Sequence, residues 1–501
     1  MTKILDALNS FVWGIPALIL ILTVGVILSV RTRWAQFRLF PTAMKSFLTQ
    51  LRQSNKDSRN SSYKALCTAL GATVGTGNLA GVAGAIAIGG PGSIFWMWVS
   101  GVLGMVTKFA EAALSVRYRV PDGNGGYLGG PMYMVQRGMG NRWRFLGGIY
   151  CFFGVVAAFG VGSATQINAV LGGIHGAVIA LGGQQSLYMD VIIGACLAVL
   201  TVTLLLGGAK RIGEAAAFLV PFASAFYMLL GIGVLVLRAY AIPMAFSAIV
   251  QGAFSPQAVT GGIVGSAFQA LRIGTSRGVF TNEAGMGTAG IAHGSAEVNH
   301  PVQQGLMGII EVFLDTIVIC TITALVILCS GVSIPYGKDL GIEITANAFS
   351  HVYGIWVHIP LAIALCLFAI ATIVGWGLYG ARCAQYLFGN RAWKWFAVLQ
   401  AFSVLLGAVL STGTVWTMSE TANGLMAIPN LIILIYLHPE LVRLVNEYQL
   451  IYGRKFTIGG SHENINQRKS MRALSYAEIS SAGSKSKGRG KENLPFEYWS
   501  A

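Results

Sequence analysis

The segment LCTALGATVGTGNLAGVA, from Leu66 to Ala83, determines the fold that we predict for this chain. It is apolar enough and long enough to enter a lipid bilayer, but its centre carries Gly71, Gly75 and Gly77. Glycine costs about 1 kcal/mol per residue in a helix interior relative to alanine. Three glycines within seven residues therefore predict that this helix unwinds inside the membrane.

An unwound turn at that depth leaves backbone N–H and C=O groups without helical partners. Hydrocarbon cannot satisfy these groups, so the turn must line a cavity or bind a ligand. Its N–H groups suit a carboxylate, and its carbonyls suit a small cation. The alternative is an unbroken glycine-rich helix that packs closely on its neighbours. The polar residues Thr73, Thr76 and Asn78 between the glycines favour the unwound turn.

The composition is that of a polytopic membrane protein: 501 residues, 54% hydrophobic, 11% charged, with a mean hydropathy of +0.64. The first apolar run, near residues 11–30, is long enough to span, and basic residues follow it, so we expect a membrane helix rather than a cleaved signal peptide. The seven cysteines and seven histidines lack disulfide or metal-ligand spacing, and no P-loop is present. These patterns argue against an enzyme.

Eleven candidate spans account for the apolar runs. They lie near residues 11–30, 65–88, 92–116, 145–171, 187–206, 213–237, 257–277, 302–331, 357–380, 393–411 and 414–437. With these spans, 30 lysines and arginines fall on one side of the membrane and three on the other, with Lys108 inside a span. The positive-inside rule then predicts an outside N-terminus and a cytoplasmic C-terminus. The net charge of +15 therefore reflects topology, and we expect no nucleic-acid partner.

Without the first span, the other ten divide into two groups of five, each opening with a glycine-interrupted helix. That pattern indicates an inverted-repeat transporter with a binding site at the membrane midplane. We expect an extra helix with a basic segment (1–64), a first repeat (65–237), a second repeat (238–438) and a basic, largely disordered tail (439–501). In the second repeat the interruption lies near Gly261–Ser266 or near Gly274–Gly287. The short segment 246–254 is expected to form an amphipathic helix on the outer face.

Charged residues at membrane depth are costly and tend to be functional. Lys108 and Glu111 are three residues apart, so they can pair on one helical face. Glu311 and Asp315 need a partner such as Arg277 or Lys108. A structural ion-pair network and a gate or proton relay both agree with this pattern.

Two further spans carry polar groups that suit ligands. Gln166, beside small residues in the fourth span, is placed to hydrogen-bond a ligand at the broken helix. In the ninth span, Ala369, Thr372 and Trp376 share one helical face. A threonine hydroxyl together with a free carbonyl suits sodium, although a helical threonine usually bonds its own preceding turn.

Three motifs closely resemble the alanine or glycine:cation symporter family: GATVGTGNLAGV at 71–82, GGPGSIFWMW at 89–98 and RGVFTNEAGMG at 277–287. The resemblance covers roughly residues 10–450. It implies sodium-coupled, in some members proton-coupled, uptake of alanine or glycine in prokaryotes. It also implies an all-α, leucine-transporter-type 5+5 inverted repeat. Two positions differ from the expected pattern, with Thr281 in place of serine and Gly290 in place of proline.

The turn at residues 75–78 also resembles the first core helix of the neurotransmitter:sodium symporters. That similarity implies sodium ligation by the carbonyls of Gly71, Val74 and Ala369 and the hydroxyl of Thr372. It implies that the N–H groups of Gly75, Thr76 and Gly77 hold the substrate carboxylate, while Gln166, Asn78 and Trp376 shape a small pocket.

We therefore expect a sodium-coupled symporter that carries alanine or glycine into a prokaryotic cell across the plasma (inner) membrane by alternating access. Its expected partners are the small amino acid, sodium as coupling ion and the lipid bilayer, with no enzymatic cofactor and a monomeric or weakly oligomeric state. One alternative is proton coupling through Glu111, Glu311 or Asp315; another is a passive channel. The choice between alanine and glycine, and between their D and L forms, stays open.

Overall fold

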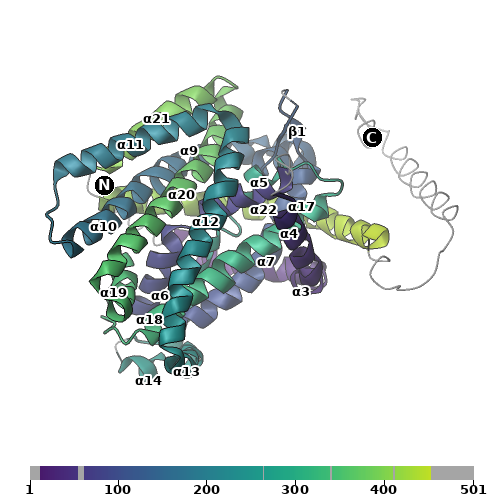
Figure 1. The fold of residues 1–501 in the computed structure, drawn as a ribbon. Coiled ribbons are helices and arrows are strands. Elements are labelled where there is room, and N and C mark those ends of the chain that lie inside the picture. Colours follow the sequence, from purple (N-terminus) through teal and green to yellow (C-terminus); the bar gives the residue numbers. More distant parts are fainter. Residues whose placement is uncertain are drawn as a thin grey trace, which may run out of the picture. The chain divides into compact units, whose positions relative to one another are not determined.

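The computed structural model describes residues 12–54, 61–123, 125–262, 264–338, 341–409 and 412–452, and these are almost entirely helical (Figure 1). The chain divides into two units, Met1–Asn446 and Glu447–Ala501. The first unit holds all the helices that surround the site. Of the predicted tail, residues up to Tyr452 belong to helix α22 (Thr412–Tyr452), and the rest lies outside the described residues. The all-α prediction is confirmed.

The second predicted span is broken where its glycines indicated. Helix α5 (Ser61–Thr73) ends before Val74, and the chain resumes as a wide turn, η1 (Gly77–Gly81), followed by α6 (Val82–Gly89). The two halves are bent by 49° at this break. The unwound turn is therefore confirmed over the unbroken helix.

The seventh span begins later than predicted and is also interrupted. Helix α15 (Ala267–Asn282) starts about ten residues after the expected position, because Gly261 and Gly262 adopt positive φ angles of 66° and 87° and turn the chain before it. The interruption lies within the second of the two candidate ranges. This interruption separates α15 from α16 (Thr288–His293). Glu283 is the first residue of the interruption and has a φ angle of 54°.

The other described helices include those that correspond to the remaining predicted spans and several short helices between them. They are α2 (Ile15–Arg31), α3 (Ala35–Arg38), α4 (Phe40–Ser54), α7 (Ser93–Arg117), α8 (Pro131–Met134), η2 (Val135–Met139), η3 (Asn141–Trp143), α9 (Arg144–Phe159), η4 (Gly160–Ala164), α10 (Thr165–Ala180), α11 (Leu187–Leu206), α12 (Gly208–Leu237), η5 (Ala239–Ala241), α13 (Ile242–Phe254), α14 (Pro256–Thr260), α17 (Pro301–Val312), η6 (Phe313–Cys320), α18 (Thr321–Cys329), α19 (Ile342–Tyr353), η7 (Ile355–Val357), α20 (His358–Phe388) and α21 (Ala392–Gly407). A short antiparallel pair, β1 (Val120–Pro121) and β2 (Tyr127–Leu128), interrupts them.

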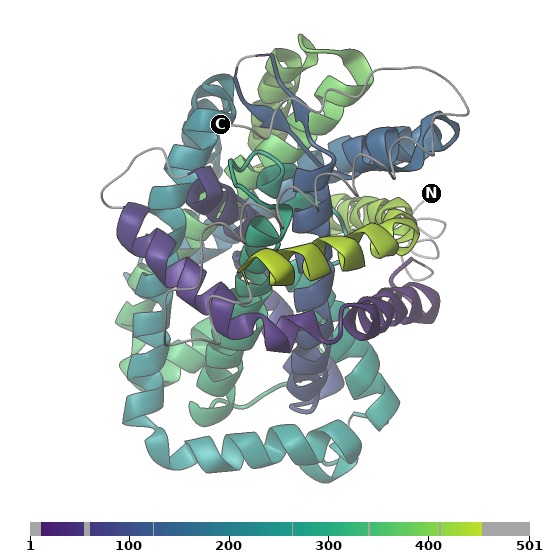
Figure 2. The same ribbon diagram turned by 90° about the vertical axis from the view of Figure 1, so that its right-hand side faces the viewer.

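Seven described helices are long and apolar enough to cross a membrane, or up to eight if the bent pair counts as one span. The three other predicted spans correspond to α2, α15 and α21, which have only 17, 16 and 16 residues. The short helix predicted near 246–254 is α13, which lies across one end of the helices (Figures 1 and 2).

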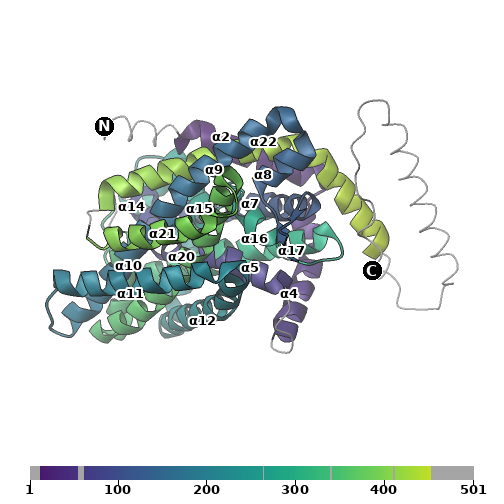
Figure 3. The ribbon, with the colours of Figure 1, turned by 90° about the horizontal axis from the view of Figure 1, so that it is seen from above.

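Burial separates central from peripheral helices. The most apolar part of α7 is 83% buried, whereas the corresponding parts of α11 and α12 are 17% and 28% buried. Helices α15 and α17 pack on α7, and α11 packs beside α21 (Figure 3). Small residues allow the central contacts, since a Cβ on Gly375 of α20 would lie 2.9 Å from the Ala72 backbone of α5. The broken helix therefore lies directly against α20.

Candidate functional site

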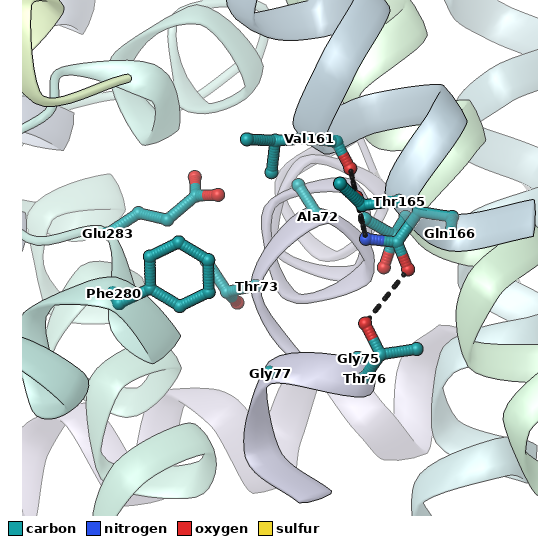
Figure 4. Close-up of a pocket in the computed structure, with 11 residues that line it drawn as sticks. Ala72, Thr73, Gly75, Thr76, Gly77, Val161, Thr165, Gln166, Phe280 and Glu283 are labelled. Atoms are coloured by element: carbon teal, nitrogen blue, oxygen red, sulfur yellow. Dashed lines mark hydrogen bonds between the residues drawn. The ribbon is translucent and has the colours of Figure 1, made fainter. Parts of the chain in front are cut away.

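The two helix breaks and α20 surround one small pocket (Figure 4). It is lined by Ala72, Thr73, Gly75, Thr76, Gly77, Val161, Thr165, Gln166, Phe280, Glu283 and Thr372. Its volume is about 30 Å³. A single water needs about 10–15 Å³ on this scale, so the space suits a ligand of few heavy atoms.

Five predicted site residues line this pocket, whereas Asn78 and Trp376 lie behind it. Asn78 is fully buried, and its side chain closes the turn because Oδ1 accepts the N–H of Gly75 at 2.8 Å. Its Nδ2 donates to Asp315 Oδ1 at 2.7 Å. The Asn78 side chain is therefore not among the lining residues, and the Gly75 N–H has an acceptor within the turn; the binding roles expected for both residues stay predictions.

The amides of Thr76 and Gly77 remain as candidates for holding an anion. They stand at the start of η1, which continues directly into α6, and the first N–H groups of a helix have no intrahelical acceptor. A helix start of this kind favours a carboxylate. The first break therefore offers two backbone donors to the pocket.

Gln166 connects this turn to the fourth span. Thr76 Oγ1 donates to Gln166 Oε1 at 3.2 Å, and Gln166 Nε2 donates to the Val161 carbonyl at 3.0 Å (Figure 4). These bonds fix the orientation of the amide. Gln166 thus lines the pocket, as the sequence predicted.

Glu283 is a pocket residue that the sequence analysis missed. Its carboxylate lies across the cavity from Thr76 and Gln166 in Figure 4, and the residue is 3% exposed. Oε1 accepts Trp376 Nε1 at 3.0 Å, and Oε2 accepts Thr288 Oγ1 at 2.7 Å. An acid inside a glycine-interrupted membrane segment is itself the signal that could have identified it.

Trp376 acts on the pocket through Glu283 rather than by roofing it. The indole is fully buried, and Gly162 leaves room for it, since a Cβ there would lie 2.3 Å from Trp376 Cβ. Its N–H instead holds one oxygen of the Glu283 carboxylate. The expected role in shaping the pocket is therefore indirect.

Two of the four predicted sodium ligands meet directly. Thr372 Oγ1 donates to the Gly71 carbonyl at 3.0 Å, across α20 and α5. Val74 follows the end of α5, and Ala369 packs in an apolar cluster one turn before Thr372. The four-oxygen sodium site stays a prediction. Among the described residues, no group of three or more His, Cys, Asp or Glu residues could hold a metal ion.

A buried ion pair lies on the other side of the second break. Lys108 Nζ donates to Glu311 Oε1 at 2.8 Å, and both side chains are 0% exposed. His293 Nε2 lies 2.9 Å from Glu311 Oε2. Of the two candidate partners of Glu311, Arg277 and Lys108, the structure pairs Lys108 with it. Lys108 therefore pairs with Glu311 instead of with Glu111, the partner that the sequence spacing suggested.

Glu111 instead holds the second break in place. Its Oε1 accepts the N–H groups of Gly285 and Gly287 at 2.9 and 3.0 Å and Asn430 Nδ2 at 2.8 Å. Three donors on one buried oxygen fix the turn whose first residue is Glu283. The acid on α7 therefore positions the acid in the pocket.

A chain of buried hydrogen bonds joins the two breaks. Asp315 Oδ1 accepts Asn78 from the first break, and its Oδ2 accepts Thr316 Oγ1 at 2.8 Å. Asn282 Nδ2 donates to Thr316 Oγ1 at 3.0 Å, and its Oδ1 accepts the Ala284 N–H of the second break at 2.9 Å. The two carboxylate oxygens of Asp315 therefore accept hydrogen bonds from neutral donors where the sequence analysis expected a cation.

Two broken membrane helices around a small polar pocket are the arrangement of the leucine-transporter-type fold. The crystal structure of MhsT in complex with L-phenylalanine shares this fold, with a TM-score of 0.52 at 15% identity, covering 77% of this chain and 97% of MhsT. The chain belongs to the sodium:alanine symporter family, whose sequence model matches residues 1–455.

Individual relatives match over most of their length. The sodium/alanine symporter AgcS of Methanococcus maripaludis is 41% identical over 440 residues, covering 87% of this chain and 94% of AgcS. The amino-acid carrier protein AlsT of Bacillus subtilis is 34% identical over 442 residues, covering 88% and 90%. The probable sodium/glutamine symporter GlnT of the same organism is 32% identical over 455 residues, covering 89% and 91%.

Proposed function

We propose that this protein carries alanine or glycine into the cell together with sodium, by alternating access. The observation that supports the proposal most strongly is the polarity of the pocket. Thr76 and Gly77 of the first break line the pocket, and the Glu283 carboxylate of the second break lies across it from Thr76 (Figure 4). A zwitterionic amino acid matches this arrangement, with its carboxylate at the amides and its ammonium at Glu283.

The small volume favours a short side chain. Val161 and Phe280 close the apolar part of the lining, and about 30 Å³ remains. A hydrophobic pocket distinguishes ligands by roughly 1–3 kcal/mol per methylene, so we expect alanine and glycine to compete more strongly than glutamine. Among the relatives, AgcS is named a sodium/alanine symporter and GlnT a probable sodium/glutamine symporter, so the pocket volume is what favours the smaller substrate in this proposal.

Sodium is placed by this proposal at the Gly71 carbonyl and the Thr372 hydroxyl, with Val74 and Ala369 carbonyls completing the oxygen set. Gly75, which also lines the pocket, lies directly beside this position, since a Cβ there would come within 2.7 Å of Thr372 Oγ1. A cation here stabilises the substrate carboxylate at the neighbouring amides. The two ligands then strengthen each other's binding, and the coupling is reciprocal.

The test is equilibrium binding of radiolabelled alanine to the purified protein at varied sodium concentration. We expect sodium to tighten alanine binding, and alanine to tighten sodium binding by the same factor. Unlabelled glycine should compete more effectively than glutamine. Alanine binding that is the same in sodium and in choline buffer would contradict the sodium-coupled proposal.

Proton coupling is the second candidate, and a specific observation supports it. Glu111, Glu283, Glu311 and Asp315 are all buried, and Lys108 is the lysine among them. The Oε2 atom of Glu111 has no hydrogen-bond partner within the described chain. A proton bound to that oxygen would lower the net negative charge of this group of buried acids. Accumulation of alanine driven by a pH gradient in sodium-free vesicles would favour this candidate.

The membrane arrangement belongs to the same proposal: a prokaryotic inner membrane, an outside N-terminus, a cytoplasmic C-terminus, repeats at 65–237 and 238–438, and a monomer or weak oligomer. Labelling of single cysteines placed at Arg142 and Lys338 in intact cells tests the orientation. We expect an impermeant reagent to label position 338 and to spare position 142. The reverse pattern would contradict the proposed topology.

A further inference from the structure

A second cavity lies away from the transport pocket, where the end of α20 meets the start of α9. Its volume is about 550 Å³, and it is lined by Leu128, Tyr133, Gln136, Arg144, Phe145, Gln385, Tyr386 and Asn390. Most of these side chains are polar. The cavity is therefore large and hydrophilic, and it shares no lining residue with the transport pocket.

The donors of this cavity suit an oxyanion. The Arg144 guanidinium has five N–H groups, and it lines the cavity together with Tyr386, whose hydroxyl it is close enough to interact with. Gln385 Oε1 accepts Arg382 Nη1 at 2.8 Å, and Gln385 Nε2 donates to Asn390 Oδ1 at 2.7 Å. This sequence of bonds leaves the Asn390 NH2 group as a donor. An arginine fork with nearby amide donors matches the geometry of phosphate.

The charge of the two segments that carry the cavity favours an anion. Residues 123–189 contain Arg137, Arg142 and Arg144 but no Asp or Glu. Residues 344–419 contain Arg382, Arg391 and Lys394, again without an acid. Asp122, just before the first segment, accepts the Gly126 N–H at 2.8 Å. The carboxylate of Asp122 is close enough to interact with Arg382, so the basic residues of these two segments outnumber this one nearby acid.

Apolar side chains border the same cavity. Phe145 lines it and is 56% exposed. Phe388 and Trp395, which lie within five residues of the lining residues Tyr386 and Asn390 in the sequence, are 75% and 72% exposed. Exposed aromatic residues beside arginines are typical of the membrane–water interface. A soluble anion needs no such apolar border, whereas a phospholipid does.

We propose that this cavity binds the phosphate of an anionic phospholipid, with the headgroup at Arg144 and Asn390 and an acyl chain along Phe145. Free phosphate has the same oxyanion chemistry and is the competing source of this ligand. We favour a phospholipid over free phosphate because the lining of the cavity is mostly polar but also includes the exposed aromatic ring of Phe145. In the proposed topology, the site faces the cytoplasmic leaflet, whose surface is negatively charged.

The test is native mass spectrometry of the full-length protein with added phosphatidylglycerol or phosphatidylcholine. We expect the wild type to retain phosphatidylglycerol, and Arg144→Gln to bind it about tenfold more weakly because a charge-assisted hydrogen bond is lost. The matched control is Arg142→Gln, which removes an equal charge from an exposed residue outside the cavity. This control should bind like the wild type.

Three results would overturn the proposal. Equal loss in both variants would indicate a general charge effect, and no loss in either would place the lipid elsewhere. Displacement of the lipid by millimolar inorganic phosphate would assign the cavity to a soluble anion. Sodium-dependent alanine binding, measured on the same samples, separates this result from the proposed transport function and shows that the variants are folded.

Discussion

Substitution of Glu283 by glutamine tests the proposed recognition of the substrate ammonium. The carboxylate is buried, and its two oxygens accept Trp376 Nε1 and Thr288 Oγ1. Glutamine has the same size and keeps one acceptor oxygen, so the turn should persist. The variant loses the negative charge that faces the ammonium. A hydrogen bond to a charged group contributes about 1.5–3 kcal/mol, which corresponds to a roughly 10- to 150-fold rise in the apparent KM for alanine.

The assay is initial-rate uptake of radiolabelled alanine into proteoliposomes under a fixed sodium gradient. Trp376→Phe is the matched control, because it removes the donor to Glu283 Oε1 but leaves the carboxylate charge. We expect a smaller rise in KM for this variant. Lactate, which lacks the ammonium, should inhibit the wild type weakly and compete relatively better in Glu283→Gln. An unchanged KM for alanine in Glu283→Gln would refute the assignment of the ammonium to this side chain.

Two further predictions concern the sodium position and the buried ion pair. Gly75→Ala places a Cβ 2.7 Å from Thr372 Oγ1, so the sodium concentration that gives half-maximal uptake should rise. The control is Gly77→Ala, whose Cβ has no neighbour closer than 3.8 Å and which should change that sodium concentration little. Equal effects of both alanines on that concentration would count against the position. Lys108→Met leaves Glu311 buried without its ammonium partner, which typically costs 3–5 kcal/mol. Thermal unfolding in detergent should show this loss, and adding Glu311→Gln should recover part of it; no recovery would contradict the pairing.

The first break was predictable because its cause is local. Three glycines and the polar residues between them weaken the helix within a single short segment, and the structure places the bend there. The second break was ambiguous for the same local reason. Glycines occur on both sides of α15, and only Gly285 and Gly287, with Glu283, take the positive φ angles that interrupt the membrane helix itself.

The contacts that complete the site depend on packing between distant segments. Lys108 and Glu311 are 203 residues apart, so their helices had to be placed before they could be paired. Local spacing favoured Glu111 instead, which bonds the amides of Gly285 and Gly287. The hydrogen bond between Asn78 and Asp315 could not be predicted from the sequence either, because Asp315 lies on another helix.

The measurement that tests the central claim most directly is accumulation of radiolabelled alanine in proteoliposomes, with and without an inward sodium gradient, for the native chain and Thr372→Ala. The account predicts accumulation above equilibrium that requires sodium and falls in Thr372→Ala, because this variant removes the hydroxyl beside the Gly71 carbonyl. Alanine that equilibrates without accumulating, or that accumulates equally under a proton gradient in sodium-free buffer, would contradict sodium-coupled symport.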